Sequence, residues 1–502
     1  MAKELGITSR AENYSEWYND LVKRADLAEN SVVRGCMVIK PNGYAVWELM
    51  QAALDRMFKD TGHVNACFPL LIPKSFFEKE AQHVEGFAKE CAIVTHHRLM
   101  PDGKGGLMPD PESELEEPYI IRPTSETIIW HSYKNWIQSY RDLPLLINQW
   151  ANVMRWELRP RLFLRTSEFF WQEGHTAHAT SEEAEQESLT ILGIYTKFCE
   201  EWMAVPVVPG IKSEGEKFPG ADHTYTIEAL TQDLRAIQAG TSHHLGQNFA
   251  KAFDVTYQSA EGKQEHVWAT SWGVSTRLIG TLLMAHSDDN GFVCPPRLAP
   301  NQVVIVPIGR KDDWDVVVRQ SEVMAETLRS TIWSGQPVRV RVDKRDRESP
   351  GFKFNDWELK GACMRIEIGP RDLAEGQCVL ARRDGADKVT LKIDDLSSVV
   401  CENLQGLHDA LFSKALKLRD DNTHRVDTWV DFKSRFASEG GGGFVLAHWD
   451  GTPETERRIN EETKATIRCI PNVPLHPDDN APGSCVLTGA PSARRVIFAK
   501  AY

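Results

Sequence analysis

The sequence predicts a mixed α/β (α+β) protein of several domains, and three observations support this fold class. The chain has 502 residues, more than one hydrophobic core usually organises, so about two to four domains are expected. Two long strand-like segments face each other across a basic loop between residues 145 and 178. From residue 302, apolar strands alternate with helical stretches, as is typical of an α/β domain.

The N-terminal part is expected to begin with two helices. Residues 14–30 and 44–60 carry apolar side chains at helical spacing, and the Lys-Pro-Asn-Gly turn at residues 40–43 separates them. The apolar stretch at residues 64–72 is bounded by prolines and favours a strand that leads out of the second helix.

The next segments alternate between exposed and regular structure. Residues 101–118 are rich in glycine, proline and acids and are expected to form an exposed loop, with a solvated acidic turn at 109–118. The two long strands that follow are joined by the arginine-rich loop 159–165. Residues 181–203 predict a helix, for which Ser181 is a suitable N-cap.

The chain divides into three expected domains, residues 1–296, 297–405 and 406–502. Adjacent prolines mark the first change of pattern, after which strands and helices alternate. The serine- and glycine-containing run at residues 438–443 is expected to be a flexible break before the last compact unit.

The composition is that of a globular protein, with 41% hydrophobic residues. No apolar run of about eighteen residues occurs, so no membrane span is expected. Ten cysteines are scattered singly without a CxxC pair, which argues against a disulfide framework and favours a reduced cytoplasm. The net charge of −13 disfavours a nucleic-acid partner, but residues 336–371 hold more basic than acidic side chains, so RNA binding stays open.

The predicted hairpin brings together residue types that suit the activation of a carboxylate by ATP. That chemistry requires positioning and charge stabilisation rather than a protein nucleophile. Side chains two residues apart on a strand share a face. The side chains predicted to share a face are Arg155 and Glu157 on one strand and Phe169, Trp171 and Glu173 on the other. A solvated hairpin with exposed arginines fits this pattern equally well.

The order of three motifs resembles that of the class II aminoacyl-tRNA synthetases. Arg155-x-Glu157, a loop and Arg165-x-x-x-Phe169 resemble motif 2, residues 273–280 resemble motif 3, and Pro69 resembles the proline of motif 1 at a homodimer interface. The resemblance implies that Arg155 and Arg277 are catalytic. It implies an ATP site formed by Arg155, Glu157, Arg165, Thr166, Phe169, Gln238, Thr241, Ser275 and Arg277. Mg²⁺ is expected with the ATP.

Further motifs are similar to those of the prolyl-tRNA synthetases. These are Arg-Pro-Thr-Ser-Glu-Thr at residues 122–127 and Gln-Ala-Gly-Thr-Ser-His-His at 238–244. By that resemblance the proline-binding residues are Thr124, Glu126, Arg155, Trp171, Glu173 and His243. His243 alone would be better interpreted as a surface or core histidine. The resemblance implies a proline–tRNA ligase that forms prolyl-adenylate and charges tRNA(Pro).

The resemblance covers nearly the whole chain and implies its architecture. It implies a class II antiparallel sheet flanked by helices, then an α/β anticodon-binding domain, and then a small α/β C-terminal domain. Residues 343–372 resemble the class IIa anticodon-binding domain, although a solvated basic face would look similar. The last residues resemble the archaeal and eukaryotic-like type, in which a terminal tyrosine, here Tyr502, returns toward the active site.

Two departures from the family are expected to matter. The positions that commonly hold zinc in the last domain are Asp450, Thr455, Cys485 and Thr488, and hydroxyl groups are poor zinc ligands. No structural zinc is therefore expected, and apolar packing should hold this domain. The interval between motifs 2 and 3 is also too short for the editing insertion of the bacterial type. Alanine is expected to be rejected weakly, because one methylene contributes only about 1–3 kcal/mol.

Two alternative functions stay open at this point. One is a related class II enzyme for threonine, glycine or histidine, which the proline-type motifs disfavour. The other is an inactive synthetase paralogue that binds tRNA or regulates another enzyme. Such proteins typically lose a motif arginine, and both Arg155 and Arg277 are present.

Overall fold

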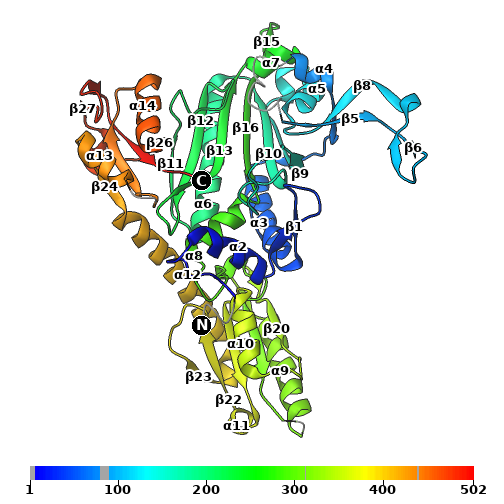
Figure 1. Ribbon diagram of the computed structural model, residues 1–502, viewed down its shortest axis with the longest axis vertical. Coiled ribbons are helices and arrows are strands. Elements are labelled where there is room, and N and C mark those ends of the chain that lie inside the picture. The colour runs from blue at the N-terminus through cyan, green and yellow to red at the C-terminus, as the bar shows by residue number, and fades with distance from the viewer. Residues whose placement is uncertain (1–5, 80–89, 311, 438–439) are drawn as a thin grey trace.

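A sheet of eleven strands forms the centre of the larger part of the molecule (Figure 1). The computed structural model describes residues 6–79, 90–310, 312–437 and 440–502. From one edge to the other, the strands are β24 (Thr423–Arg425), β25 (Phe444–His448), β29 (Arg495–Ala499), β26 (Thr466–Pro471), β11 (Val207–Ile211), β12 (His223–Leu230), β13 (Ala236–Gly246), β16 (Trp268–Ser275), β10 (Glu168–His178), β9 (Leu145–Met154) and β3 (Val64–Asn65). Only β3–β9 and β24–β25 pair in parallel among these neighbours, so the expected antiparallel sheet is confirmed.

The central strands fix which side chains face the site. β10 pairs with β9 and with β16 in antiparallel register, so that Glu173 lies between Gln149 and Gly273. β9 and β10 are the two long strands expected around the basic loop, and that expectation is confirmed. Side chains at alternate positions of β10 therefore share one face with those of the neighbouring strands.

Helices cover the sheet through two apolar clusters. The larger cluster joins α2 (Tyr14–Arg24), α3 (Pro41–Asp60), α6 (Ser181–Glu201) and α8 (Arg277–His286) to the sheet. The smaller one contains α5 (Glu126–Trp136) and α7 (Asn248–Phe253). Packing is close: a Cβ atom at Gly174 would lie 2.1 Å from the ring of Trp272, so only glycine fits there.

Several helix boundaries differ from the expectation for local reasons. Pro41 is the first residue of α3, so the expected turn at 40–43 is mostly the first helical turn, where proline loses no hydrogen bond. The first helix ends at Arg24, before the short strands β1 (Ala28–Asn30) and β2 (Met37–Ile39). The N-cap of α6 is Thr180 rather than Ser181, and its side chain accepts a hydrogen bond from the backbone N–H of Glu183 at 3.1 Å.

The segment expected to be a strand followed by a loop is built differently. Residues 64–72 form no single strand, because β3 joins the large sheet and β4 (Leu71–Pro73) joins a separate three-stranded sheet. The expected loop at 101–118 instead contains the hairpin β6 (Leu99–Pro101) and β7 (Leu107–Pro109) and most of β8 (Glu114–Ile121), which pairs with β4 and with β5 (Ala92–His96). Gly103 and Gly105 adopt positive φ at the hairpin turn. The apolar side chains of this hairpin are exposed, so its sequence lacks the pattern of a buried strand.

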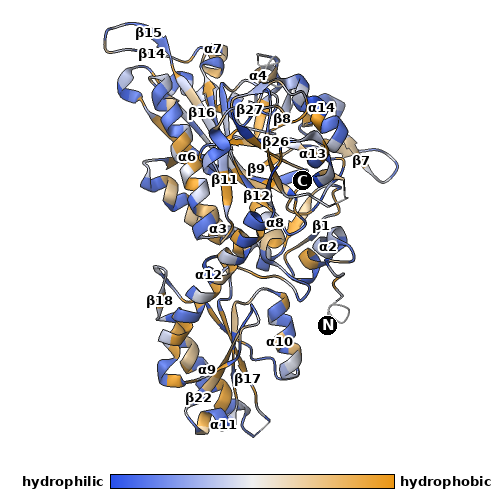
Figure 2. Cartoon of the chain, turned by 90° about the vertical axis from the view of Figure 1, so that its left-hand side faces the viewer, coloured by the Kyte–Doolittle hydropathy of each residue, from blue (hydrophilic) through white to orange (hydrophobic). Residues whose placement is uncertain are grey.

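The expected α/β domain follows the prolines near residue 296. Its sheet has the order β20 (Val340–Val342), β17 (Val303–Pro307), β21 (Met364–Ile368), β22 (Gln377–Arg382) and β23 (Val389–Lys392). The first three strands are parallel and the last two antiparallel. Its helices are α9 (Trp314–Arg329), α10 (Pro350–Leu359) and α11 (Pro370–Ala374). The strands at its centre are strongly hydrophobic in Figure 2, as expected for strands covered on both faces.

The last unit is continuous with the large sheet and does not form a sheet of its own. α12 (Leu396–Asp421) runs without a break across residue 405, where the domain boundary was expected, and leads up to this unit (Figure 1). Its strand β26 pairs with β11, placing Gly210 opposite Pro471. A Cβ atom at Gly210 would lie 2.6 Å from the carbonyl oxygen of Ile470, so the two strands meet closely.

The remaining elements are short. They are α4 (Lys74–Lys79), β14 (Thr256–Gln258), β15 (Gln264–His266), β18 (Ile332–Trp333), β19 (Gln336–Pro337), α13 (Trp429–Phe436), α14 (Pro453–Thr463), β27 (Gly483–Ser484) and β28 (Pro491–Ser492). Residues 438 and 439 of the expected flexible break lie outside the described residues. Gly443 donates its backbone N–H to the carbonyl of Leu234 at 3.0 Å. Within the described part of the chain, no helix combines the length and apolarity needed to span a bilayer.

Candidate active site

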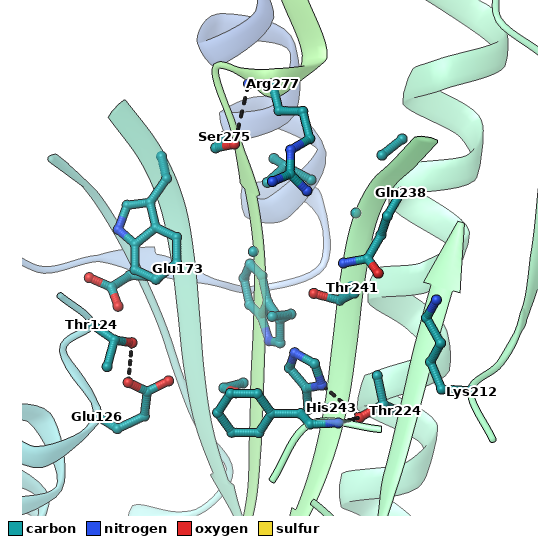
Figure 3. A pocket seen from close by; sticks show the side chains of 18 of the residues that line it. Thr124, Glu126, Glu173, Lys212, Thr224, Gln238, Thr241, His243, Ser275 and Arg277 are labelled. Atoms are coloured by element: carbon teal, nitrogen blue, oxygen red, sulfur yellow. Dashed lines mark hydrogen bonds between the residues drawn. The ribbon is translucent and has the colours of Figure 1, made fainter. Parts of the chain in front are cut away.

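Two adjoining cavities open on the sheet between β10, β12, β13 and β16. The first has a volume of about 360 Å³, and Figure 3 shows side chains from several strands pointing into it. The predicted residues that line it are Thr124, Glu126, Arg155, Phe169, Trp171, Glu173, Gln238, Thr241, His243, Ser275 and Arg277. The second cavity, of about 450 Å³, shares Arg155, Phe169, Ser275 and Arg277 with the first, and adds Glu157, Arg165 and Thr166. The structure therefore brings every predicted site residue to one cavity or the other.

Arg155 lies where the two cavities meet. It follows the end of β9, and its Nε donates to the carbonyl of Pro123 at 2.8 Å. Its guanidinium lies 5.6 Å from the ring centre of Phe169 and 5.1 Å from that of Trp171, which are favourable cation–π distances. Burial lowers the pKa of Arg155 to about 10, so the group keeps its positive charge at neutral pH.

Arg277 enters the site from the first position of α8 (Figure 3). Its Nε donates to the carbonyl of Leu164 at 3.3 Å, which links it to the loop between β9 and β10. Its backbone N–H donates to the hydroxyl of Ser275 at 3.2 Å. Burial lowers the pKa of Arg277, and the nearby Arg165 adds to this effect.

Thr124 and Glu126 form one wall of the first cavity. The hydroxyl of Thr124 donates to the carboxylate of Glu126, which is the first residue of α5 (Figure 3). Glu126 is buried and lies in the first turn of the helix. The cavity is thus lined by both the carboxylate of Glu126 and the half-buried cation of Arg155.

Glu173 uses both carboxylate oxygens within the chain. Oε1 accepts from the hydroxyl of Ser125 at 2.5 Å and from Nε2 of Gln149 at 2.8 Å, while Oε2 accepts from Nε2 of His175 at 3.1 Å. Burial acts to raise the pKa of Glu173, but the bonds from His175, Ser125 and Gln149 lower it overall. Glu173 lines the cavity as expected, and its bonds hold neighbouring groups in place.

His175 was missed by the sequence reasoning. It lines the first cavity, and its Nδ1 is buried without a hydrogen-bond partner in the described structure. Burial acts to lower its pKa, but the bond to Glu173 and the charges of Glu126 and Glu173 raise it overall. The signal that could have found it is parity, because His175 continues the face of Trp171 and Glu173 along β10.

A loop at residues 212–219 closes another side of the first cavity, and it too was missed. Its lining members are Lys212, Glu216, Lys217, Phe218 and Pro219. The ring of Phe218 lies 4.8 Å from that of His243, whose Nδ1 is hydrogen bonded to the hydroxyl of Thr224 at 3.0 Å (Figure 3). Burial lowers the pKa of His243 to about 3, so its imidazole is neutral at physiological pH. The loop's sequence has no apolar periodicity that could place it over the cavity.

The positions compared with zinc ligands form a hydrogen-bonded cluster. Asp450 Oδ2 accepts from the hydroxyls of Thr455 at 2.8 Å and Thr488 at 2.9 Å, and Cys485 is buried three residues before Thr488. Among the residues that the structure describes, no group of three His, Cys, Asp or Glu side chains could hold a metal ion. The carboxylate and the two hydroxyls satisfy one another.

Tyr502 packs against the loop between β9 and β10. Its hydroxyl donates to Asp233, and its ring lies 5.4 Å from the guanidinium of Arg161. The other contact of that guanidinium is the ring of Tyr18 at 4.6 Å. Arg161 is thereby held between two aromatic rings in the loop that carries Arg165.

The antiparallel sheet, the arginine shared by two cavities and the second arginine at a helix start are arranged as the motif resemblance to the class II tRNA synthetases implies. Residues 110–286 match the family model described as the tRNA synthetase class II core domain (G, H, P, S and T). Residues 302–403 match that of the anticodon binding domain, and residues 429–502 that of the prolyl-tRNA synthetase C-terminal domain. The chain belongs to the proline–tRNA ligase family.

Relatives support this membership over the full length. The chain is 59% identical to the proline–tRNA ligase of Bacteroides fragilis over 505 residues, and 58% identical to that of Porphyromonas gingivalis, covering 100% of both chains in each case. It resembles the crystal structure of prolyl-tRNA synthetase from Cryptosporidium parvum complexed with halofuginone and AMPPNP. That match has a TM-score of 0.89 and 36% identity, and it covers 99% of this chain and 97% of the other.

Proposed function

We propose that this chain joins L-proline to AMP with release of pyrophosphate, and then transfers the prolyl group to the 3′ end of tRNA(Pro). The observation that carries this proposal is the placement of Arg155, whose half-buried guanidinium lines both cavities. The first cavity holds the residues assigned to proline, and the second adds Glu157, Arg165 and Thr166, which are assigned to ATP. A fixed positive charge at their junction would lie where the amino-acid carboxylate meets the α-phosphate.

The chemical step needs only the substrates and this positioning. A carboxylate oxygen of proline attacks the α-phosphorus, the bond to the bridging oxygen breaks, and pyrophosphate leaves with that electron pair. Arg155 stabilises the negative charge that builds on the α-phosphate oxygens in the transition state. Its desolvation strengthens this effect, because charges interact more strongly where water is excluded.

The smaller cavity is assigned to proline. Its secondary ammonium would donate to the carboxylate of Glu126 and the hydroxyl of Thr124. Trp171 and the neutral His243 offer flat surfaces to its ring, and Glu173 holds the surrounding groups. The charges of Glu126 and Arg155, which line the same cavity, match the two charges of a zwitterionic amino acid.

The larger cavity and the adjoining strands are assigned to ATP. Phe169 and Arg277 would cover the two faces of adenine, and the remaining contacts are assigned to Glu157, Arg165, Thr166, Gln238, Thr241 and Ser275. Mg²⁺ bound with ATP would neutralise phosphate charge. Glu90 and Glu157 bring carboxylate oxygens to the larger cavity, and these are the ligands that Mg²⁺ prefers.

The other parts of the chain are assigned by the same family membership. Residues 1–296, 297–405 and 406–502 are the proposed catalytic, anticodon-binding and C-terminal units. The proposed subtype is the archaeal and eukaryotic-like one, with Tyr502 near the active site. No structural zinc is proposed, because the Asp450 cluster satisfies its own polar groups. The cytoplasm is the proposed compartment.

A homodimer is proposed through the region of Pro69. Among the residues that the structure describes, β3 is an edge strand with no neighbour on its outer side. Val64, Leu70 and Leu71 are exposed beside that edge. Exposed apolar side chains next to an open strand edge favour burial against another chain.

The decisive experiment is ATP–pyrophosphate exchange with each of the twenty amino acids. Proline is expected to support the fastest exchange, with slower but measurable exchange on alanine. Arg155→Ala should lose at least about a hundredfold in kcat/KM while its circular dichroism spectrum and Tm stay close to those of the unmodified protein. Preference for threonine, glycine or histidine would replace the proposed substrate, and no exchange with any amino acid would favour an inactive paralogue.

A further inference from the structure

The C-terminal helix α14 reaches the loop at residues 212–219 that closes the first cavity. Glu456, in the first turn of α14, accepts a hydrogen bond at its Oε1 from the hydroxyl of Ser213 at 2.8 Å. Both side chains are buried, with Ser213 only 2% exposed. A Cβ atom at Gly215 would lie 2.9 Å from Oε2 of Glu456, so the loop rests directly on this carboxylate.

A second connection fixes the start of the same loop. The ammonium of Lys212 donates to Oε1 of Glu228 at 3.0 Å and to the carbonyl of Arg468 at 2.8 Å. The guanidinium of Arg468 donates to the other oxygen of Glu228 at 3.0 Å. These three charged side chains are almost fully buried, and they join β12 of the catalytic sheet to β26 of the C-terminal unit.

Hydrogen bonds within the loop connect these contacts to the amino-acid pocket. The carbonyl of Ser213 accepts from the backbone N–H of Lys217 at 3.0 Å, which fixes the turn of the loop. The backbone N–H of Phe218 then donates to the hydroxyl of Thr224 at 2.9 Å, and the same hydroxyl is bonded to His243. A short series of hydrogen bonds thus runs from α14 to the wall of the pocket.

The base of α14 is itself anchored. Thr455, the neighbour of Glu456, donates to Asp450 within the cluster that also holds Thr488. Thr452 caps the helix by accepting from the backbone N–H of Thr455 at 3.3 Å. The direction of the Glu456 side chain is therefore set by contacts inside the C-terminal unit.

We propose that α14 braces the loop at residues 212–219, and that Glu456 and Ser213 are positioning residues for the amino-acid pocket. The proposal rests on the assignment of that pocket to proline. Neither residue lines the cavity, so each would act through the loop rather than by touching the substrate. Burial and the neighbouring Glu216 raise the pKa of Glu456 to about 7, because burial disfavours a charged carboxylate. The hydrogen bond from Ser213 and the charge of Lys212 act in the opposite direction and lower this pKa. The bond from Ser213 and the charge of Lys212 are therefore the contacts that favour the buried carboxylate beside the loop.

The test compares both ends of the Ser213–Glu456 bond with a matched control. Ser213→Ala removes the donor without touching the C-terminal unit, and Glu456→Ala removes the acceptor. Glu456→Gln keeps an acceptor oxygen and should behave like the unmodified protein. Glu461→Ala alters an exposed glutamate of the same helix and serves as the control.

Two readouts separate positioning from general stability. Without substrates, hydrogen–deuterium exchange of the backbone at residues 213–219 should accelerate in Ser213→Ala and Glu456→Ala only. In pyrophosphate exchange, the same variants should raise the KM for proline about fivefold, the effect of one ordinary hydrogen bond, with the KM for ATP unchanged. The double variant should be no worse than either single one.

Other results would overturn the brace. Unchanged loop exchange in both alanine variants, or an equal rise in the KM values for proline and ATP, would show that α14 does not position the pocket. Faster loop exchange with an altered KM for a different amino acid would leave the brace standing and remove the assignment to proline. The loop measurement contains no substrate, so it judges the brace independently of the proposed function.

Discussion

The carboxylate of Glu173 accepts a hydrogen bond from the hydroxyl of Ser125 at 2.5 Å, and this bond joins the strand β10 to the residue that precedes α5. Thr124 and Glu126, on either side of Ser125, both line the first cavity, so this bond holds the segment that carries them. The same carboxylate also holds His175 and Gln149. One buried charge therefore organises the wall to which proline binding is assigned.

Glu173→Gln is expected to raise the KM for proline at least about tenfold, because a buried donor is left unpaired when one carboxylate oxygen becomes an amide. The KM for ATP should change much less. Both are measured by pyrophosphate exchange. Glu168→Gln, at an exposed position of the same strand, is the control and should leave both constants unaltered. An unchanged proline KM in Glu173→Gln would remove the organising role.

Tyr502→Ala is expected to raise the KM for ATP by about threefold to tenfold, because Arg161 loses one of its two aromatic partners. The carbonyl of Arg161 accepts a hydrogen bond from the backbone N–H of Leu164. The carbonyl of Leu164 in turn accepts a hydrogen bond from the side chain of Arg277. Tyr502→Phe keeps the ring and should show a smaller effect. A proline KM that rises as much as the ATP KM would contradict this route of action.

Acid sensitivity is expected from His286. Burial lowers its pKa to about 4. The carbonyl of Met203 accepts a hydrogen bond from its Nε2 at 2.8 Å, which only partly offsets this effect. The unfolded chain takes up a proton as the pH falls below about 6.5, while the folded chain does not until about pH 4. Its contribution to stability is thus complete above pH 6.5 and declines below it, by about 1.4 kcal/mol at pH 5.5.

His286→Gln keeps a donor for Met203 but does not titrate. The fall in Tm between pH 7.5 and pH 5.5, both chosen as about one unit either side of the ordinary histidine pKa, should be smaller in this variant. His223→Gln replaces a histidine that is half exposed and should keep the full acid sensitivity. Identical acid sensitivity in all three proteins would rule out His286 as its source.

Asp450→Ala is expected to lower the free energy of unfolding by about 1–3 kcal/mol, since the hydroxyls of Thr455 and Thr488 lose their shared acceptor. The purified protein is expected to contain no stoichiometric zinc by elemental analysis. Dialysis against a chelator should leave its Tm unaltered. One tightly bound zinc per chain would contradict the interpretation of this cluster.

Alanyl-tRNA is expected to persist once formed. The chain between Glu173 and Gly273 is occupied by α6, α7 and strands that belong to or adjoin the central sheet, with no separate domain. Discrimination by the pocket alone amounts to about 1–3 kcal/mol for one methylene. The measurement is deacylation of alanyl-tRNA(Pro) by the purified protein, with prolyl-tRNA(Pro) as the control substrate. Rapid and selective hydrolysis would reveal an editing activity.

Local sequence patterns predicted the elements that carry their own periodicity. The parity of β10 placed Phe169, Trp171 and Glu173 on one face, because alternation along a strand is a local property. Arg155 and Glu157 were expected to share a strand face too, but β9 ends at Met154, so they lie beyond the strand. The hairpin β6–β7 was missed, since its side chains are exposed and show no buried stripe. Thr124 and Glu126 came to attention only through family resemblance.

The remaining features depend on pairing between distant segments. The loop carrying Phe218 and the brace from Glu456 arise where chain segments more than two hundred residues apart meet, and no local pattern encodes that meeting. The same holds for the junction of β26 with β11. The sequence predicted a compact last unit at residues 406–502, but not the pairing of its strand with the large sheet.

The pairing of β26 with β11 has a consequence for how this protein is made. During synthesis, β11 emerges from the ribosome about 255 residues before its partner, a delay on the order of tens of seconds. For that interval the nascent chain carries an open strand edge beside its active site. Unfinished chains would expose unpaired backbone N–H and C=O groups at this edge, which chaperones could bind. Only a fully translated polypeptide could complete the sheet next to the substrate pocket.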